Sequence, residues 1–328
     1  MTTKNNSKIS DEDLRSILGK VKPGSQNHYI SDCPICGKTS HFYIKRDTQL
    51  WDCKKCGESG NIISLLIAVN KLFLLGEYKS IDREKITLLN EYLNQFDEDL
   101  DTEVSERKKP VGFKRVMSDE YLEKRKLTQS NFQKFDIGYT NLTPSLKDYV
   151  IFLIKEDNLT RGYVARLNWS KDKIKKYEKE TGIKKPRYRN DKGAKFSNLL
   201  FGYDEINEKT STVILVEGLI DKITLDNILC LDEQDEIKCC ATFGKKISQF
   251  QILKLLSKNL KKVILIFDDD AIPEMKKYGS LLSNFFLVEM TYTIGKDIND
   301  SDEDDVISMF DRLMSVEKFN RSAVKIKL

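Results

Sequence analysis

Two stretches of sequence decide the fold: Val-Ile-Leu-Val-Glu-Gly at 213–218 and Val-Ile-Leu-Ile-Phe-Asp-Asp-Asp at 263–270. Each is a short, β-branched apolar run that ends abruptly in carboxylates. Apolar runs of this length without alternation are typical of strands buried on both faces of a parallel sheet, and ligands bind at the carboxyl ends of such strands. Glu217 and Asp268 to Asp270 follow these ends, and carboxylates gathered there would repel one another unless a hard cation such as Mg²⁺ joined them. The two stretches therefore predict a metal site that handles phosphates.

The sequence around these runs alternates regularly between strand and helix signals. Strands are predicted at 213–216, 237–241, 263–267 and 285–290, and helices near 219–229, 248–259 and 271–283. Such alternation predicts parallel βα units. The region before them has mixed signals, with strands predicted at 151–154 and 162–167.

The length and composition of the chain limit its number of domains and its location in the cell. A chain of 328 residues is long enough for two or three domains. No signal peptide and no apolar run long enough to span a bilayer is found, so we expect no membrane partner. Four of the seven cysteines stand in CxxC pairs and the other three, Cys230, Cys239 and Cys240, are interpreted as buried thiols; this usage favours a reducing, cytoplasmic location.

The net charge of +4 is unevenly distributed. Between 171 and 195 there are eleven Lys/Arg and four Asp/Glu, whereas between 297 and 311 there are seven Asp/Glu and no Lys/Arg. A basic stretch and an acidic one suit a polyanion-binding protein with its own cation site. A solvated helix face followed by an acidic tail would explain either stretch alone.

Cys33-Pro-Ile-Cys36 and Cys53-Lys-Lys-Cys56 predict a structural zinc site. Two residues between cysteines form a knuckle whose thiolates share one tetrahedral metal, and two knuckles complete a Cys₄ site for one zinc ion per chain. Cations near the ligands are candidates for contacts with nucleic acid, although they could equally belong to a solvated surface: Lys45, Arg46 and Lys54. Phe42 and Trp51 are interpreted as the core of this module.

The Gly37-Lys38-Thr39 tripeptide is not interpreted as a phosphate-binding loop. That motif requires a glycine five residues before Gly37, where Asp32 stands, and it lies between a strand and a helix rather than inside a zinc knuckle. No other stretch of the sequence offers such a loop. An ATP-driven helicase within this sequence is therefore not expected.

The carboxylate motifs resemble those of the TOPRIM domain that primases and topoisomerases share. Its marks are Glu-Gly after a first strand, here at 217–218, and Asp-x-Asp after a later one, here at 268–270. The Ala-Thr-Phe-Gly stretch at 241–244 resembles the intervening primase segment, and Gly-Lys-Asp-Ile-Asn-Asp at 295–300 resembles the acidic motif that follows. The resemblance spans roughly 212–300 and has the motifs in the family's order.

The rest of the chain resembles other parts of DnaG-type primases. The N-terminal module is similar to the primase zinc-binding domain, with Cys36 where bacterial primases usually place a histidine, as in several bacteriophage primases. Three stretches resemble the basic subdomain of the polymerase core: 135–139 (Phe-Asp-Ile-Gly-Tyr), 162–166 (Gly-Tyr-Val-Ala-Arg) and 186–190 (Pro-Arg-Tyr-Arg-Asn). One departure is that Lys195 precedes Phe196, whereas a lysine follows the phenylalanine in the bacterial form.

The resemblance implies an α/β architecture with a division into domains. We expect a zinc ribbon with flanking helices at 1–96, a linker at 97–112, and a polymerase core. The core would hold a mixed α+β basic subdomain at 113–210 and a mostly parallel TOPRIM subdomain at 211–300, followed by a C-terminal tail at 301–328. Helical patterns at 62–73 and 81–96 would flank the zinc site.

The resemblance and the chemistry together predict the site residues. Joining two nucleotides requires an activated 3′-hydroxyl and a neutralised triphosphate, which two divalent ions supply. Glu217, Asp268 and Asp270 would hold Mg²⁺ or Mn²⁺ as the catalytic carboxylates, with Asp297 assisting, and Glu217 would be a candidate to move a proton. Asp269 and Asp221 are interpreted as structural. Template or triphosphate would contact basic residues, for each of which a solvated surface is the alternative: Arg166, Arg187, Arg189, Lys192 and Lys195.

These features predict a primase that makes short RNA primers on single-stranded DNA from ribonucleoside triphosphates. A separate replicative helicase would be its partner, and the zinc module would help to choose the start site. One alternative is a TOPRIM nuclease or topoisomerase-like enzyme. A second is a non-catalytic zinc-and-TOPRIM recombination mediator, which the intact acidic residues disfavour.

Overall fold

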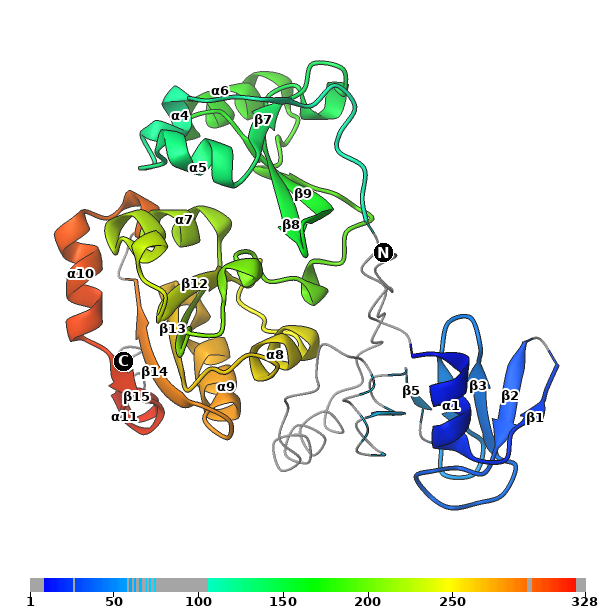
Figure 1. Cartoon of the computed structure of the whole chain (residues 1–328). Coiled ribbons are helices and arrows are strands. Elements are labelled where there is room, and N and C mark those ends of the chain that lie inside the picture. The colour runs from blue at the N-terminus through cyan, green and yellow to red at the C-terminus, as the bar shows by residue number, and fades with distance from the viewer. Residues whose placement is uncertain are drawn as a thin grey trace. The chain divides into compact units, whose positions relative to one another are not determined.

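The computed structural model describes residues 9–25, 27–57, 59–60, 106–293 and 297–322, together with 62, 65, 66, 69, 71 and 74. The described residues belong to two compact units, one holding the N-terminal region and one holding most of the chain after residue 105, and each is described by itself. Figure 1 traces the elements of both units. The helical pattern predicted at 81–96 lies outside the described residues, and of the pattern at 62–73 the buried residues Ile62, Leu65 and Leu66 are described.

The N-terminal unit is a small antiparallel sheet beside one helix. Helix α1 (Asp11–Leu18) begins after Ser10, whose hydroxyl accepts a hydrogen bond from the Asp13 N–H and so caps the helix. The sheet has the order β1-β2-β3-β4-β5, and its strands are β1 (Lys22–Pro23), β2 (His28–Ser31), β3 (Phe42–Lys45), β4 (Trp51–Cys53) and β5 (Ser59–Gly60). Phe42 and Trp51 are buried and stacked with ring centroids 5.2 Å apart, so the prediction that they form the core is confirmed.

A second antiparallel sheet opens the larger unit, in the order β10-β9-β8-β7-β6. Its strands are β6 (Lys114–Arg115), β7 (Ile137–Tyr139), β8 (Tyr149–Glu156), β9 (Leu159–Leu167) and β10 (Tyr188–Asn190). Strands β8 and β9 contain both strands predicted here and form a hairpin. Asp157 and Asn158 at its tip have φ values of 55° and 61°, the left-handed conformation that a two-residue turn of this kind requires.

Three helices accompany this sheet: α4 (Glu120–Glu123), α5 (Gln129–Lys134) and α6 (Lys171–Thr181). Thr128 and Asn131 form a capping box at the start of α5. Helix α6 connects β9 to β10 and begins after Ser170, whose hydroxyl accepts from the Lys173 N–H. Gly182 ends α6 in the left-handed conformation, with φ of 69°.

The third sheet is mostly parallel, in the order β12-β11-β13-β14-β15. Its strands are β11 (Thr212–Val216), β12 (Ile237–Ala241), β13 (Lys262–Phe267), β14 (Leu287–Tyr292) and β15 (Met314–Ser315). The first four pair in parallel and β15 pairs antiparallel to β14. The α/β architecture expected from the sequence is confirmed, with a cysteine-bearing antiparallel sheet, an antiparallel core sheet and a mostly parallel sheet.

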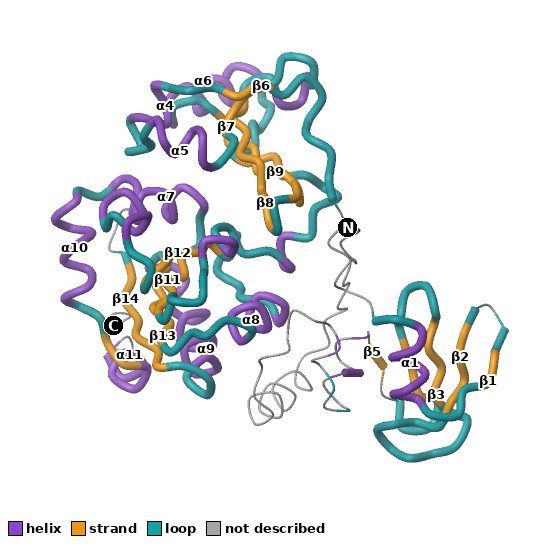
Figure 2. The backbone as a smooth tube through the Cα atoms, viewed as in Figure 1, coloured by secondary structure: helices purple, strands orange, loops and turns teal. Residues whose placement is uncertain are grey.

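Helices connect the parallel strands as the alternation predicts: α7 (Leu219–Ile228), α8 (Gln249–Leu256) and α9 (Ile272–Leu282). Helix α7 packs on β11, β12 and α10 (Glu303–Asp311), whereas α9 packs on β13, β14 and α11 (Val316–Ser322). Figure 2 shows these helices around the strands of the sheet. None of the helices among the described residues is long and apolar enough to cross a bilayer.

One predicted strand is displaced in the structure. We predicted 285–290, but β14 is Leu287–Tyr292. The N–H groups of Phe285 and Phe286 both donate to the carbonyl oxygen of Leu282, which holds the two aromatic residues in the turn that ends α9. Their apolar side chains are buried there, so the apolar pattern of the sequence did not distinguish turn from strand.

Candidate metal centre and nucleic-acid interface

The strand order places a topological switch point between β11 and β13. The chain leaves β11 toward β12 on one side and then crosses to β13 on the other, so the connections diverge at the ends of β11 and β13. In open parallel sheets such a switch point is where ligands bind, at the carboxyl ends of the strands. Glu217 follows β11 and Asp268 follows β13, so both lie at this point.

Three carboxylates come together at the switch point. Glu217, Asp268 and Asp270 each offer an oxygen within 4.8 Å of the others. The Asp268 backbone N–H donates to Glu217 Oε1 at 3.1 Å, and the Thr293 hydroxyl donates to Asp268 Oδ1 at 3.1 Å. These hydrogen bonds fix the directions of two carboxylates from neighbouring strands. The sequence-predicted catalytic residues are therefore adjacent in space.

The electrostatics of this cluster favour a cation. Burial raises the pKa of Glu217 to about 7, against a smaller opposing effect of the Asp268 N–H, and the neighbouring Asp268 and Asp270 raise it further. Burial and Asp297 also raise the pKa of Asp268. The Lys245 ammonium lies 3.8 Å from Asp270 Oδ2 and is 41% exposed, so it offsets the negative charge of the cluster only weakly. Hard oxygen ligands of this number and spacing fit Mg²⁺ or Mn²⁺.

Two more carboxylates influence the cluster. Asp297, the residue before the 3₁₀ turn Ile298–Asp300, is exposed and lies outside the 4.8 Å group, although its charge raises the pKa of Asp268. Asp221 is half-buried in the first turn of α7, and burial raises its pKa to about 6, with Asp268 and Asp297 adding to the effect. A role for Asp297 as a metal ligand stays a prediction.

Asp221 is held in place by contacts that the sequence analysis did not anticipate. Asn299 Nδ2 donates to Asp221 Oδ1 at 2.9 Å, and Asn299 Oδ1 accepts from Arg125 Nη1. A Cβ on Gly218 would lie 2.5 Å from Asp221 Oδ2, so the glycine of the Glu-Gly pair makes room for this carboxylate. Glu217 stands at a strand end and Asp221 follows four residues later, in the first turn of the next helix. This spacing is the sequence signal from which the position of Asp221 beside Glu217 could have been predicted.

The four cysteines of the N-terminal sheet also converge. Their Sγ atoms lie within 4.8 Å of one another, with Cys36 Sγ 3.9 Å from Cys53 Sγ. A tetrahedral zinc site with Zn–S bonds of about 2.3 Å requires separations of roughly 3.8 Å. Burial by itself raises the pKa of Cys53, but the N–H groups of Cys56 and Lys55 lower it to about 7, whereas burial raises the pKa of Cys33 to about 12, so metal binding would displace protons from the group. The cluster fits zinc.

The basic residues near the cysteines that are predicted to contact nucleic acid differ in their exposure and in the ion pairs that they already form. Arg46 stacks over the Tyr29 ring at 4.9 Å and pairs with Asp11 at 3.3 Å. Lys54 pairs with Asp52 at 2.7 Å while remaining 68% exposed, and Lys45 is exposed at the end of β3. Arg46 therefore has a structural role, and its contact with nucleic acid stays a prediction.

In the core sheet, Arg166 is buried, with 9% of its surface exposed, unlike the other basic residues predicted to contact template or triphosphate. Its Nε donates to the Tyr121 hydroxyl at 2.8 Å and its guanidinium lies 5.1 Å from the Tyr188 ring centre. Arg189 is exposed and donates to the Tyr149 hydroxyl at 3.1 Å. Arg187 and Lys192 are exposed and Lys195 is half-buried.

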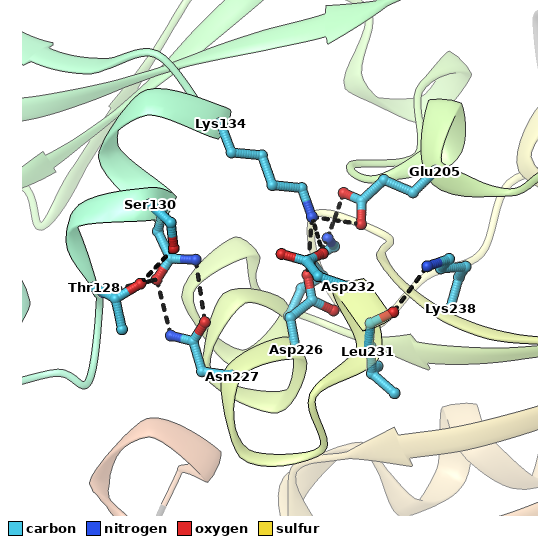
Figure 3. Close-up of polar contacts among 11 residues, drawn as sticks. Thr128, Ser130, Lys134, Glu205, Asp226, Asn227, Leu231, Asp232 and Lys238 are labelled. Atoms are coloured by element: carbon cyan, nitrogen blue, oxygen red, sulfur yellow. Dashed lines mark hydrogen bonds and ion pairs between the residues drawn. The ribbon is translucent and has the colours of Figure 1, made fainter. Parts of the chain in front are cut away.

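A second group of carboxylates, which the sequence analysis missed, is occupied by lysines. Glu205, Asp226 and Asp232 converge, but Lys134 of α5 lies 2.8 Å from Glu205 and 2.5 Å from Asp232 (Figure 3). Lys222, fully buried, pairs with Glu205 at 2.5 Å and with Asp226. Because ammonium groups already neutralise it, this group is a structural link between α5 and α7 rather than a metal site.

Comparisons with known proteins agree with the motifs. No family model matches the chain. It is 26% identical over 296 residues to a DNA primase of Aquifex aeolicus (strain VF5), which covers 78% of this chain and 56% of the relative. It is 25% identical over 298 residues to a DNA primase of Thermotoga maritima, which covers 79% of this chain and 50% of the relative. Both relatives are DNA primases. The resemblance to primases predicted from the motifs is thereby confirmed.

The extent of the primase similarity is limited. The chain spans about half the length of these curated relatives. Among solved structures, the zinc-binding and RNA polymerase domains of the Aquifex aeolicus primase are 20% identical, with a TM-score of 0.46, over 96% of this chain and 86% of that one.

Proposed function

We propose that this protein is a DNA primase that joins ribonucleotides into short RNA primers on single-stranded DNA. The observation that carries the proposal is the cluster of Glu217, Asp268 and Asp270 at the switch point of the parallel sheet, in a chain similar to primases over 78% of its length. The Cys₄ cluster and the order of the acidic motifs support it.

The mechanism follows from what the carboxylates can hold. A divalent cation bound there would neutralise the charge that develops on the triphosphate and lower the pKa of the attacking 3′-hydroxyl. Glu217 and Asp268 hold their oxygens in fixed directions through the bonds to the Asp268 N–H and the Thr293 hydroxyl. Glu217, whose pKa is about 7 without a metal, would be the member of the cluster that gives up a proton as the cation binds, and it is our candidate for proton transfer.

Other parts of the proposal concern binding. Arg166, Arg187, Arg189, Lys192 and Lys195 would contact template or triphosphate, and Asp297 would assist at the metal. One zinc ion would hold the N-terminal sheet together, and Lys45, Arg46 and Lys54 would contact the template near its start site. A separate helicase would expose the template, and the site of action would be the cytoplasm.

The test is a synthesis assay with matched variants. Purified protein receives single-stranded DNA of varied sequence, labelled ribonucleotides and Mg²⁺, beside Asp268→Ala and Asp269→Ala. Asp269 is the control because it is adjacent but lies outside the cluster. Short RNA from the wild type and the control, absent with Asp268→Ala, is the expected result.

Two other outcomes would replace the proposal. Nicking of DNA that depends on Asp268, without RNA synthesis, would indicate a nuclease or topoisomerase-like enzyme. DNA binding that survives Asp268→Ala, without synthesis or nicking by any form, would indicate a recombination mediator.

A further inference from the structure

Helix α6 differs from the other long helices in that none of its side chains is buried. One edge is nevertheless anchored: Ile174 and the neighbouring Trp169 pack against the apolar core of the β8–β9 sheet, and Trp169 contacts Tyr177 edge-on at 5.3 Å. Lys185 Nζ lies 4.5 Å from the Trp169 ring centre and 2.7 Å from Asp148. The helix is therefore held in a fixed orientation, although it contributes little to the core.

The other side of α6 presents a stripe of cations. Lys171, Lys175 and Lys179 are exposed and spaced four residues apart, which places them about 6 Å apart along the helix. Within the described residues, no carboxylate lies within 4.0 Å of any of the three ammonium groups. Like charges at this spacing disfavour a helix in isolation, so a bound polyanion would stabilise the stripe.

The carboxylates of α6 do not neutralise this stripe. Glu180 lies 3.9 Å from Lys176, which is outside the stripe. Glu178 accepts a hydrogen bond from the Lys185 N–H at 3.1 Å. Asp172 stands in the first turn, where a carboxylate favours the helix dipole.

The stripe begins at a cavity of about 50 Å³. By the volume that one water requires, it has room for about four atom-sized groups, which is close to a phosphate group. Its lining includes four cations, Arg125, Arg166, Lys171 and Arg187, and two aromatic rings, Tyr121 and Trp169. In the described part of the chain no carboxylate lies within 4.0 Å of the buried Arg166 guanidinium, whose hydrogen bonds go to tyrosine hydroxyls, and Asp221 acts on it only from a greater distance.

Hydrogen bonds link the lining of the same cavity to Asp221, whose pKa is raised by burial and by Asp268 of the acidic cluster. Arg125 lines it, lies 3.5 Å from Asp300 and donates to Asn299, which in turn donates to Asp221 at 2.9 Å. Arg125 therefore contacts both the cavity, where a DNA strand would bind, and the segment beside the candidate metal ligands.

We propose that Lys171, Lys175 and Lys179, together with Arg166 and Arg187 at the cavity, form a track for the phosphates of the single-stranded DNA template. The inference rests on the proposed primase function and extends its binding surface to α6. The lysine spacing is close to that of successive phosphates in an extended strand. The occupant is the template rather than the product, because no product exists when the first bond forms, whereas the template already spans the site.

The test compares three sets of substitutions in the full chain. Lys171→Gln, Lys175→Gln and Lys179→Gln together remove the stripe while keeping helix propensity. Replacing the same three lysines by Arg keeps the charge. Lys209→Gln, Arg312→Gln and Lys318→Gln together form the control, since these residues are exposed and the change in net charge is identical. Thermal melts establish that each variant is folded.

The measurement is the affinity for a labelled oligothymidylate as a function of salt concentration, with an RNA–DNA hybrid of equal length as a second ligand. Loss of three phosphate contacts should make the slope of log K against log salt less negative by about 2 and weaken binding roughly tenfold at moderate salt. The Arg variant and the control should match the wild type.

Each other outcome has one meaning. Unchanged affinity and slope in the Gln variant, with a wild type that binds, overturns the track while leaving the primase proposal intact. Loss of hybrid binding alone assigns α6 to the product duplex and overturns the template assignment. A wild type that neither binds single strands nor makes RNA removes the primase proposal itself.

Discussion

Glu217 Oε1, at the end of β11, accepts a hydrogen bond of 3.1 Å from the backbone N–H of Asp268, at the end of β13. The bond joins two residues 51 positions apart and brings two carboxylates together that repel each other. We expect the repulsion between these carboxylates to lower the free energy of unfolding of the metal-free protein, and a bound cation to reverse this loss. Three of the predictions below concern sites that require a bound metal.

Neutralising Glu217 should stabilise the metal-free protein. Burial raises its folded pKa from 4.5 to about 7, so the folded state binds more protons than the unfolded state between these pH values, and stability falls as the pH rises through that window. Glu217→Gln removes this loss. We expect its melting temperature in EDTA at pH 8 to exceed that of the wild type by about 2–4 °C. At pH 4 the difference should disappear. A Glu217→Gln protein that melts lower at pH 8 would contradict the assigned burial.

Binding of Mg²⁺ should release protons below neutral pH. A cation can bind only after the proton on Glu217 has left, and Asp221, with a pKa of about 6, adds to the effect in more acidic solution. Calorimetry at pH 6.5 in buffers of different ionisation enthalpy should therefore show proton release that vanishes near pH 8.5. Asp269→Ala is the control and should behave as the wild type. Equal proton release at both pH values would show that Glu217 is not at the metal.

Removal of one zinc ligand should unfold the N-terminal sheet selectively. Cys53 is buried and its Sγ lies within the four-sulfur group, whereas Cys230 is exposed and outside it. Structural zinc contributes on the order of 10 kcal/mol to folding. We expect one zinc ion per chain by elemental analysis in the wild type and in Cys230→Ser. Cys53→Ser should contain none, and Trp51 fluorescence should report exposure. Full zinc content in Cys53→Ser would contradict the Cys₄ assignment.

Replacing Lys222 should destabilise the larger unit. The Lys222 ammonium is fully buried between Glu205 and Asp226, so Lys222→Met would leave these two carboxylates with Lys134 alone, 2.8 Å from Glu205 and 3.7 Å from Asp226. Loss of one partner of a buried pair costs about 3–5 kcal/mol. The control is Lys209→Met, which breaks an exposed pair with Asp235 and should change the free energy of unfolding little, because solvent screens such a pair. Urea unfolding measures both, and equal losses in the two variants would contradict the structural role of the group.

The parallel sheet and its acidic cluster could be predicted because their signals are local. An apolar run such as 213–216 has one structural solution in a chain that alternates strand and helix, and the carboxylates that follow are then placed by topology. The four cysteines could be predicted for the same reason, since their spacing alone forms two knuckles. The strand predicted at 285–290 was misplaced because buried apolar residues such as Phe285 and Phe286 occur in turns as well as in strands.

The contacts between distant segments could not be predicted from local patterns. Asn299 reaches Asp221 and Arg125 across 78 and 174 positions, and Lys134 reaches Glu205 across 71. Each depends on where the sheets and helices pack against one another. The burial of Arg166 is a similar case, since a basic residue in a strand is ordinarily interpreted as exposed.

The most direct test of the central claim is the sequence of the RNA that the protein makes. Single-stranded templates that differ at one position are incubated with all four ribonucleotides and Mg²⁺, and the products are identified by mass spectrometry. A template-directed primase should make short RNAs complementary to each template, changing at the altered position, and Asp268→Asn should make none. RNA whose sequence ignores the template, or undiminished synthesis by Asp268→Asn, would contradict the proposed function.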